Sequence, residues 1–294
     1  MSPFSEKIRR ILGYKNMAWR SVDAPMMNPK PMLTPLTGGY RRIPVLQIGA
    51  DIYCDTSLIA RTLERVQPEP TIFPEGREAE ISIFSLWADR QLFQQSIPLA
   101  LSAAEQFLTP EFKADREAMA PQIKFDRLKL AVPDARNQIR GSFSLLSDML
   151  EGRSFLLGEA FSLADASVYT SIWFLQNAPD AKALYEAKPA LVAWFERCRA
   201  LGRGKETSLD AEEALAIAKT AETSTKEQAD PDDPNGFSPG DRVTVMPDDY
   251  AFDPVAGVVL ALSAEEIAIR REDPEVGASV VHFPRIGYRI TRAS

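Results

Sequence analysis

Ser2-Pro3-Phe4-Ser5-Glu6-Lys7-Ile8-Arg9-Arg10-Ile11-Leu12 is the stretch that does most to decide the fold of this chain. A Ser-Pro-Phe turn comes first, and the apolar residues in and after it are spaced three and four positions apart. This spacing places them on one face of an amphipathic helix. Gly13 follows, and glycine is common just after the end of a helix. The stretch therefore predicts a turn that leads into a helix with one apolar face.

Two later stretches continue the unit that this helix begins. Ile43-Pro44-Val45-Leu46 predicts a strand with its proline at the start, because proline lacks the N–H that a sheet interior needs. Asp55-Thr56-Ser57-Leu58-Ile59 predicts the start of a helix that runs to residue 66. Two more strands are predicted at residues 18–22 and 51–53. The first 75 residues therefore follow the order helix, strand, loop, strand, strand, helix.

The middle of the chain is helical. Apolar residues recur at helical spacing through residues 81–107 and 134–150, which predicts a bundle that spans residues 76–221. Ser162 and Asp165 stand three positions apart ahead of another apolar helix, which is the arrangement of a capping box.

The last part of the chain changes composition twice. Residues 222–239 are rich in acids and proline and predict a linker, because they have little apolar surface to bury. From residue 240 onward apolar residues alternate with polar ones, as at Val243 and Val245. About five short strands predict a small five-stranded β-barrel over residues 240–294. We expect this barrel to fold separately, around a small core of its own.

Composition disfavours several classes of protein. The chain has 294 residues and a net charge of −7. This charge disfavours nucleic acid and anionic membranes as partners, because both bind positively charged surfaces. No apolar run reaches the roughly 18 residues that span a bilayer. Two cysteines without metal-like spacing fit a reducing compartment, and a cytoplasmic location is expected. The single histidine, His282, cannot form a common zinc site with them, so we predict no metal and interpret His282 as structural or exposed.

Taken in order, the three N-terminal stretches resemble the glutathione-binding half of the cytosolic glutathione transferases, and the Ser162–Asp165 cap resembles their helical half. The resemblance implies an α+β protein with a thioredoxin-like domain at residues 1–75 and an all-α bundle at residues 76–221. An acidic linker and the β-barrel are additions to that plan. The implied function is activation of the thiolate of glutathione, the co-substrate, for attack on a small electrophile. A homodimer that pairs through residues 81–101 is also implied.

The resemblance assigns a serine-type site. Ser2 takes the place of the catalytic hydroxyl that donates to the glutathione sulfur, and Ser5 takes a glutathione-binding position one turn later. Ile43-Pro44 resembles the cis-proline step whose backbone pairs with the cysteinyl part of glutathione. Asp55 and Thr56 match the acid–hydroxyl pair that receives the ammonium and carboxylate of the γ-glutamyl end.

Each assignment has a structural alternative. Ser2 is a common type of helix cap, and Pro44 also fits a trans proline at a strand start. Asp55-Thr56 also fits an ordinary cap of the following helix. Arg41-Arg42 fits either a contact with the glycyl carboxylate or a solvated strand entrance. For the whole protein, the alternative function is a non-catalytic binding or scaffold protein with a transferase fold.

In the transferase fold a strand precedes the catalytic turn, whereas this sequence begins at the turn itself. A sheet without that strand would leave main-chain hydrogen-bonding groups unpaired. We expect that the natural protein begins earlier and includes this strand. The alternative is a short chain in which another segment fills the edge of the sheet.

Overall fold

A computed structural model of the chain describes residues 2–293. Its elements divide between two compact units. The first comprises Met1–Trp19, Leu63–Glu117 and Gln122–Glu206, and the second comprises Arg20–Thr62, Ala118–Pro121 and Thr207–Ser294. Four elements cross the division: helices α3 (Thr56–Val66) and α6 (Pro110–Met119), and the strands of a two-stranded sheet, β1 (Ala18–Ser21) and β4 (Lys205–Ser208).

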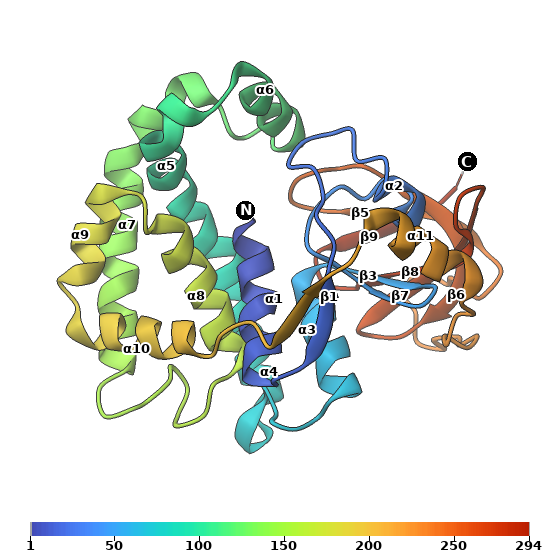
Figure 1. Ribbon diagram of the computed structural model, residues 1–294, viewed down its shortest axis with the longest axis horizontal. Coiled ribbons are helices and arrows are strands. Elements are labelled where there is room, and N and C mark those ends of the chain that lie inside the picture. The colour runs from blue at the N-terminus through green and yellow to red at the C-terminus, as the bar shows by residue number, and fades with distance from the viewer. Residues whose placement is uncertain (1, 294) are drawn as a thin grey trace. The chain divides into compact units, whose positions relative to one another are not determined.

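The first unit is a bundle of helices (Figure 1). Its helices, of which α6 ends in the second unit, are α1 (Pro3–Tyr14), α4 (Glu78–Trp87), α5 (Phe93–Ala104), α6 (Pro110–Met119), α7 (Leu128–Met149), α8 (Leu163–Leu175), α9 (Pro179–Glu186) and α10 (Pro189–Ala200). Helix α1 packs against α8 and buries Ile8, Ile11 and Leu12. The opening helix and its apolar face are therefore confirmed.

Asp165 closes the capping box that was predicted at the start of α8. Its Oδ2 accepts hydrogen bonds from the backbone N and the Oγ of Ser162 at 2.9 and 2.8 Å. Its Oδ1 accepts from Nε1 of Trp194 at 2.8 Å, which ties α8 to α10. Burial raises the pKa of this fully enclosed carboxyl, although the four hydrogen bonds it accepts counter that effect. The box thus both starts α8 and joins two helices of the bundle.

The second unit is built on a seven-stranded sheet (Figure 1). In spatial order the strands are β2 (Val45–Ile48), β3 (Asp51–Cys54), β8 (Gly277–Pro284), β7 (Glu266–Asp273), β6 (Val255–Leu262), β5 (Arg242–Pro247) and β9 (Tyr288–Arg292). Neighbouring strands are antiparallel, except that β3 and β8 are parallel. Helices α2 (Thr34–Thr37) and α11 (Ala211–Thr220) pack against each other and against β8.

The predicted order of the first 75 residues is observed, with α2 as an addition in the proline-rich loop. The five C-terminal strands also form, but the predicted barrel is not confirmed, because their sheet is open. To close a ring, β9 would have to pair with β8. The second edge of β8 is instead occupied by β3, which lies in the N-terminal part of the chain. Alternation within residues 240–294 could not reveal a partner outside them.

The C-terminal strands share their hydrophobic core with the β2–β3 hairpin. Ile52 and Cys54 of β3 lie in the same buried cluster as Val281 and Phe283 of β8. Phe237, from the segment predicted to be a linker, is only 6 % exposed and belongs to this cluster as well. The expectation of a separate core is therefore not met, since one core is shared by the β2–β3 hairpin and the C-terminal strands.

Truncation after Thr220 tests how far the hairpin depends on this shared core. It removes β5 to β9 and uncovers the apolar side chains of β3, and each Å² of apolar surface returned to water costs about 25 cal/mol. We expect the truncated protein to be insoluble, or to unfold at a much lower urea concentration than the full chain, as followed by circular dichroism. A truncated protein with the urea midpoint of the full chain would contradict the shared core.

Candidate functional site

Ser2 lies at the start of α1, in extended backbone with φ −88° and ψ 131°. Its carbonyl accepts from the backbone N of Ser5 and of Glu6 at 3.1 and 3.4 Å, whereas its side chain makes no capping hydrogen bond. The Ser2 hydroxyl therefore does not serve as the helix cap. A helix N-terminus carries a partial positive charge that favours an anion nearby.

Helix α1 is held firmly within the first unit. Lys7 is fully buried and forms an ion pair with Asp89 at 2.5 Å between Nζ and Oδ2. The ring of Phe4 packs on that of Phe93, with 4.6 Å between ring centroids. These contacts fix the turn that carries Ser2 and Ser5 relative to the bundle.

The other predicted site residues meet at one end of the β2–β3 hairpin, in the second unit. The two strands are antiparallel and place Val45 opposite Cys54. Ile43-Pro44 precedes β2 at the same end of the hairpin at which Asp55-Thr56 follows β3. The Ile43–Pro44 peptide bond is cis, as the resemblance predicts.

Asp55 is the half-buried carboxylate at this hairpin end. Its φ of 74° lies in the left-handed region, which is uncommon for a residue other than glycine. Its carbonyl accepts from the N of Ile59, and its Oδ1 accepts from the N and the Oγ of Ser57 at 2.9 and 2.7 Å. Asp55 therefore caps α3. Oδ2 accepts from Oη of Tyr288 at 3.3 Å, and within residues 2–293 no cation pairs with this carboxylate.

Two buried tyrosines stand behind Asp55. Tyr40 and Tyr288 are 3 % and 9 % exposed, and their hydroxyl oxygens are 2.9 Å apart. Burial raises the pKa of both phenols well above 10. Both hydroxyls therefore remain protonated and can act as donors.

The guanidinium group of Arg42 is engaged by contacts within the protein. It forms an ion pair with Asp249 at 2.5 Å, donates to the carbonyl of Tyr250, and lies over the Tyr250 ring at 3.6 Å from Cζ to the centroid. At 8 % exposure it is not a solvated strand entrance. Because Asp249 neutralises it, Arg42 is not available as a free cation either.

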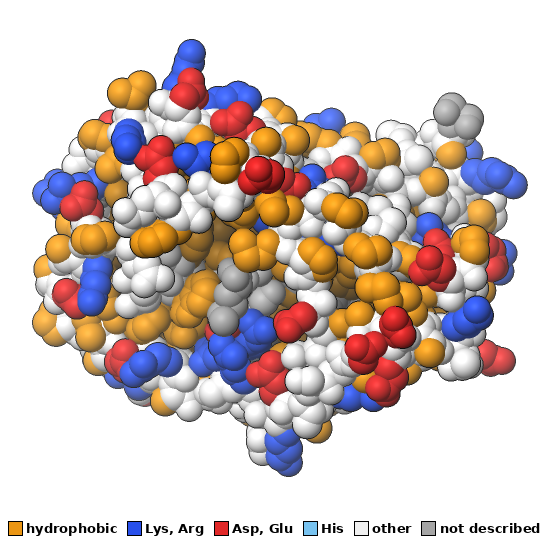
Figure 2. All heavy atoms as spheres, turned by 45° about the horizontal axis from the view of Figure 1, so that its top comes forward, with side chains coloured by type: hydrophobic (Ala, Val, Ile, Leu, Met, Phe, Trp, Pro, Cys, Tyr) orange, Lys and Arg blue, Asp and Glu red, His pale blue; other side chains and the backbone are white. Residues whose placement is uncertain are grey.

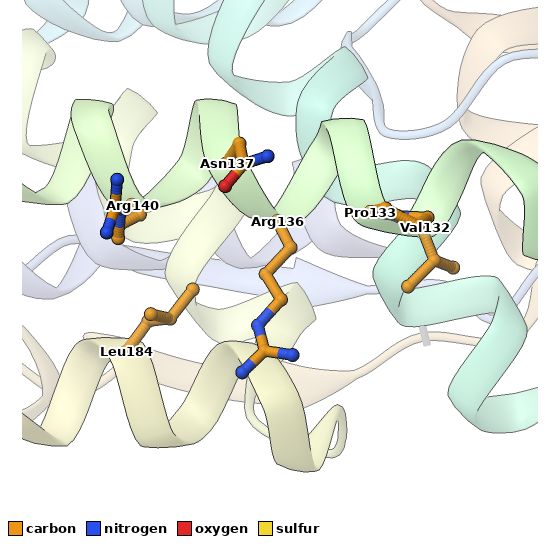
Figure 3. Close-up of a pocket in the computed structure, with 6 residues that line it drawn as sticks. All are labelled: Val132, Pro133, Arg136, Asn137, Arg140 and Leu184. Atoms are coloured by element: carbon orange, nitrogen blue, oxygen red, sulfur yellow. The ribbon is translucent and has the colours of Figure 1, made fainter.

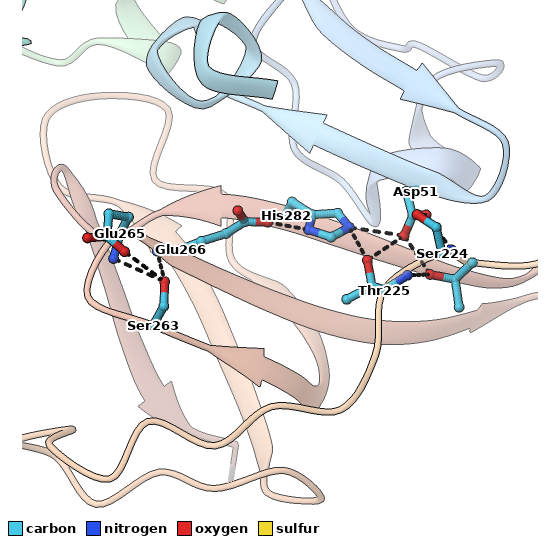
Figure 4. Close-up of polar contacts among 8 residues, drawn as sticks. Asp51, Ser224, Thr225, Ser263, Glu265, Glu266 and His282 are labelled. Carbon is cyan, nitrogen blue, oxygen red and sulfur yellow. Dashed lines mark hydrogen bonds and ion pairs between the residues drawn. The ribbon is translucent and has the colours of Figure 1, made fainter. Parts of the chain in front are cut away.

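His282 is buried between two carboxylates (Figure 4). Its Nε2 lies 3.1 Å from Oδ1 of Asp51, and its Nδ1 lies 2.6 Å from Oε1 of Glu266. Its ring stacks on Tyr53 with 4.3 Å between centroids. The interpretation of His282 as structural is confirmed, and the exposed alternative is wrong.

Asp51 also holds the segment that follows α11 (Figure 4). It accepts from the Oγ1 of Thr223 at 2.5 Å, from the N and Oγ of Ser224 at 2.8 and 2.9 Å, and from the Oγ1 of Thr225 at 2.9 Å. Burial opposes the charge of Asp51, but hydrogen bonds from His282, Thr223 and Ser224 outweigh it and lower the pKa of this carboxyl. Burial likewise opposes the charge of His282, but hydrogen bonds to Asp51 and Glu266 raise its pKa.

A pocket of about 500 Å³ lies between α7 and α9 in the first unit (Figure 3). Its lining residues are Val132, Pro133, Arg136, Asn137, Arg140 and Leu184. Arg136 extends toward α9, which carries Leu184. None of the residues predicted for the site lines this pocket.

Lys and Arg side chains lie among Asp and Glu side chains on the face shown in Figure 2. In the described part of the chain, no group of three or more His, Cys, Asp and Glu side chains could hold a metal ion. None of the helices formed by residues 2–293 combines the length and the apolar character needed to cross a membrane.

Comparison with known proteins identifies the family. Residues 1–71 match the glutathione S-transferase N-terminal domain, and residues 99–201 match the C-terminal domain. The crystal structure of a GST-like protein from Pseudomonas syringae superposes on 100 % of this chain and 96 % of its own, with 36 % sequence identity and a TM-score of 0.84. The chain belongs to the glutathione transferase superfamily. The match in P. syringae includes the C-terminal strands, which lie outside both family domains.

More distant relatives share parts of the chain. A glutathione S-transferase from Rhodospirillum rubrum F11 is 19 % identical, with a TM-score of 0.55 over 68 % of this chain and 84 % of its own, and shows the same fold. An isoprene-epoxide–glutathione S-transferase from Rhodococcus sp. (strain AD45) is 27 % identical over 122 residues. That match covers 38 % of this chain and half of the length of the curated relative.

Sequence reasoning missed the side chains that the C-terminal strands bring to the hairpin. A lone histidine in the apolar run Val280-Val281-His282-Phe283 was a usable signal, because a buried imidazole needs a polar partner. Asp51, the acid that starts the buried strand β3, was the candidate for the polar partner of this imidazole. Nothing comparable marked Tyr288, which is 233 positions from Asp55 in the sequence.

The Asp51–His282 pair predicts a pH window for stability. Because the folded pKa of Asp51 is lowered from 3.8, its contribution is present above about pH 4 and is lost as the pH falls through the folded value. Because the folded pKa of His282 is raised from 6.5, its contribution is complete below about pH 6.5 and is lost as the pH rises through the folded value. Both contributions are therefore present between about pH 4 and 6.5.

In this window we expect His282→Gln to lower the free energy of unfolding by about 3 kcal/mol, the cost of breaking a buried charged pair. The loss should shrink above the folded pKa of His282. Urea unfolding of both proteins across the pH range measures the difference, and a constant difference from pH 4 to 9 would show that the charge of His282 plays no part.

Proposed function

We propose that this protein binds glutathione and activates its thiolate for attack on a small electrophile. One observation carries the proposal. In a member of the transferase superfamily, Ile43-Pro44 and Asp55-Thr56 meet at the end of the β2–β3 hairpin where α3 begins. These are the positions at which the resemblance places the recognition of the cysteinyl and γ-glutamyl parts of glutathione.

The electrostatics of Asp55 support this assignment. Its carboxylate is half-buried and receives only neutral donors within residues 2–293. A carboxylate removed from water without a counter-ion gains from a cation that reaches it. The α-ammonium of glutathione supplies that cation, while the hydroxyl of Thr56 and the N-terminus of α3 receive the neighbouring α-carboxylate. The backbone of Ile43 pairs with the cysteinyl part.

Ser2 is the proposed catalytic residue. A free thiol has a pKa of about 8.5 and is mostly protonated at neutral pH. The Ser2 hydroxyl donates to the sulfur, and the N-terminus of α1 favours the anion, so both lower the thiol pKa. Ser5 contacts glutathione one turn further on. The thiolate then forms a C–S bond as the electrophile opens or loses its leaving group, and the thiol proton passes to solvent. The epoxide in the name of the Rhodococcus relative supports an electrophile of this size.

The alternative is a non-catalytic binding or scaffold protein. The parallel pairing of β3 with β8 favours it, because this pairing makes the added strands part of the hairpin sheet. Glutathione binding separates the two proposals: the scaffold alternative predicts no binding at millimolar concentration.

Two substitutions test glutathione binding and catalysis separately. We expect Asp55→Asn to weaken glutathione binding at least tenfold, since a hydrogen bond between charged groups contributes about 1.5–3 kcal/mol. We expect Ser2→Ala to leave the glutathione Kd within about twofold. We expect it to lower kcat about tenfold or more, because the developing thiolate loses one hydrogen-bond donor. Calorimetry gives the Kd, and conjugation of a chromogenic electrophile gives kcat.

The pH profile serves as the control for Ser2. Loss of its hydroxyl should move the acidic limb of kcat to higher pH, because a less stabilised thiolate forms only at higher pH. An unshifted profile with unchanged kcat would remove Ser2 from the mechanism. Wild-type protein without heat of glutathione binding at 5 mM (about five-thousandfold above a micromolar Kd) would favour the scaffold alternative.

We also infer a cytoplasmic homodimer, with no nucleic-acid or membrane partner. Residues 81–101 cover most of α4 and α5, and two apolar side chains of α4, Ile83 and Leu86, are 71 % and 39 % exposed. A second copy of the chain covers this face in the proposed dimer, as the family resemblance implies.

Light scattering at micromolar concentration tests the dimer. We expect twice the chain mass for the wild-type protein and for Leu145→Glu, which alters a side chain 65 % exposed on α7. We expect the single chain mass for Ile83→Glu, because a buried unpaired charge is costly. A monomeric wild-type protein would contradict the dimer. A dimeric Ile83→Glu variant would show that the dimer interface does not include this face of α4.

A further inference from the structure

Tyr288 connects the C-terminal strands to the hairpin end. It starts β9, which lies at one edge of the sheet, and its Oη donates to Oδ2 of Asp55 at 3.3 Å. Its ring is held by packing on Phe283, with 5.4 Å between centroids. The contact lies wholly within the second unit. The two family domains end at residues 71 and 201, so neither contains Tyr288.

The direction of the hydrogen bonds follows from proton counting. Each phenol has one O–H to donate, and an ionised carboxylate can only accept. Tyr288 donates its proton to Asp55, so the 2.9 Å contact between the two phenol oxygens requires Tyr40 to be the donor to Tyr288. The chain of bonds therefore runs from Tyr40 through Tyr288 to Asp55. Burial, which raises the pKa of both phenols, keeps the two protons in place.

The two oxygens of Asp55 thus have different roles. Oδ1 accepts twice from Ser57, in the first turn of α3, and has no capacity left. Oδ2 accepts once, from Tyr288, and retains one acceptor site within the described chain. A carboxylate fixed at both oxygens cannot rotate about its Cβ–Cγ bond without losing a partner. The remaining acceptor site therefore points in a set direction.

We propose that Tyr288, held in turn by Tyr40, is a positioning residue that orients Oδ2 of Asp55 toward the α-ammonium of glutathione. The C-terminal strand β9 thereby takes part in substrate recognition. This inference rests on the proposed function. A binding group that is already oriented loses less rotational freedom when the ligand arrives, and the difference is seen as affinity.

Tyr288→Phe removes the hydroxyl and keeps the ring. It is compared with wild type against two ligands, glutathione and the same tripeptide without its α-amino group (glutaryl-cysteinyl-glycine). We expect the Kd for glutathione to rise about three- to tenfold, the range for one hydrogen bond. We expect the Kd for the desamino ligand to be unchanged, because that ligand has no ammonium for Asp55. A merely structural role would weaken both ligands equally.

Thr291→Val is the matched control. Thr291 also lies on β9, and its exposed hydroxyl bonds to Thr244 at 2.8 Å and not to the hairpin end. Its loss should leave both Kd values unchanged. In an Asp55→Asn background, Tyr288→Phe should have little further effect on glutathione, since the two substitutions interrupt one interaction.

The outcomes separate this inference from the proposed function. Wild-type protein that binds no glutathione overturns the proposed function and this inference with it. Wild-type protein that binds glutathione, with Tyr288→Phe unchanged or equally weakened for both ligands, overturns this inference alone. If Tyr288→Phe does not fold, Tyr40→Phe replaces it, because it removes the donor that holds Tyr288. The same dependence on the ammonium should appear with a smaller change in Kd, and its absence would again overturn the inference.

Discussion

The parallel pairing of β3 with β8 is the constraint on which the rest of the second unit depends. Asp51, Ile52 and Tyr53 lie opposite Val280, Val281 and His282, and the N of Val280 donates to the carbonyl of Ala50 at 3.0 Å. This pairing brings together segments more than 200 positions apart, which is a costly contact to close by chain diffusion alone. It must therefore be specified by side chains on both of its faces.

The two faces do so in different ways. On one face, Ile52 and Val281 join the hydrophobic core. On the other, Asp51 meets His282, and Tyr53 stacks on the same imidazole ring. A slip of one residue would turn Asp51 into the apolar core and Ile52 toward the imidazole, because side chains alternate along a strand. A carboxylate buried there without donors would cost several kcal/mol, so the polar pair fixes the register that the apolar face alone would leave ambiguous.

Local patterns predicted the local elements well. The apolar spacing after Ser2, the capping box at Asp165 and the hairpin before Asp55 each depend on neighbours within a few positions. The open sheet could not be predicted in this way. Alternation identifies a strand and its two faces, but it says nothing about which strand will lie along either edge. The partner of β8 is a strand of the N-terminal hairpin, and the composition of residues 222–239 likewise concealed the buried ring of Phe237.

The proposed site also depends on the C-terminal strands, and one short strand, β3, connects it to them. β3 begins at Asp51, which is bound by His282, and ends at Cys54, directly before Asp55. Only three residues therefore separate Asp51, in the buried polar cluster, from Asp55, the carboxylate proposed to bind the ligand. The C-terminal strands act on Asp55 twice, through the register of β3 and through the hydroxyl of Tyr288. The strands added to the transferase plan thus set both the place and the direction of this carboxylate.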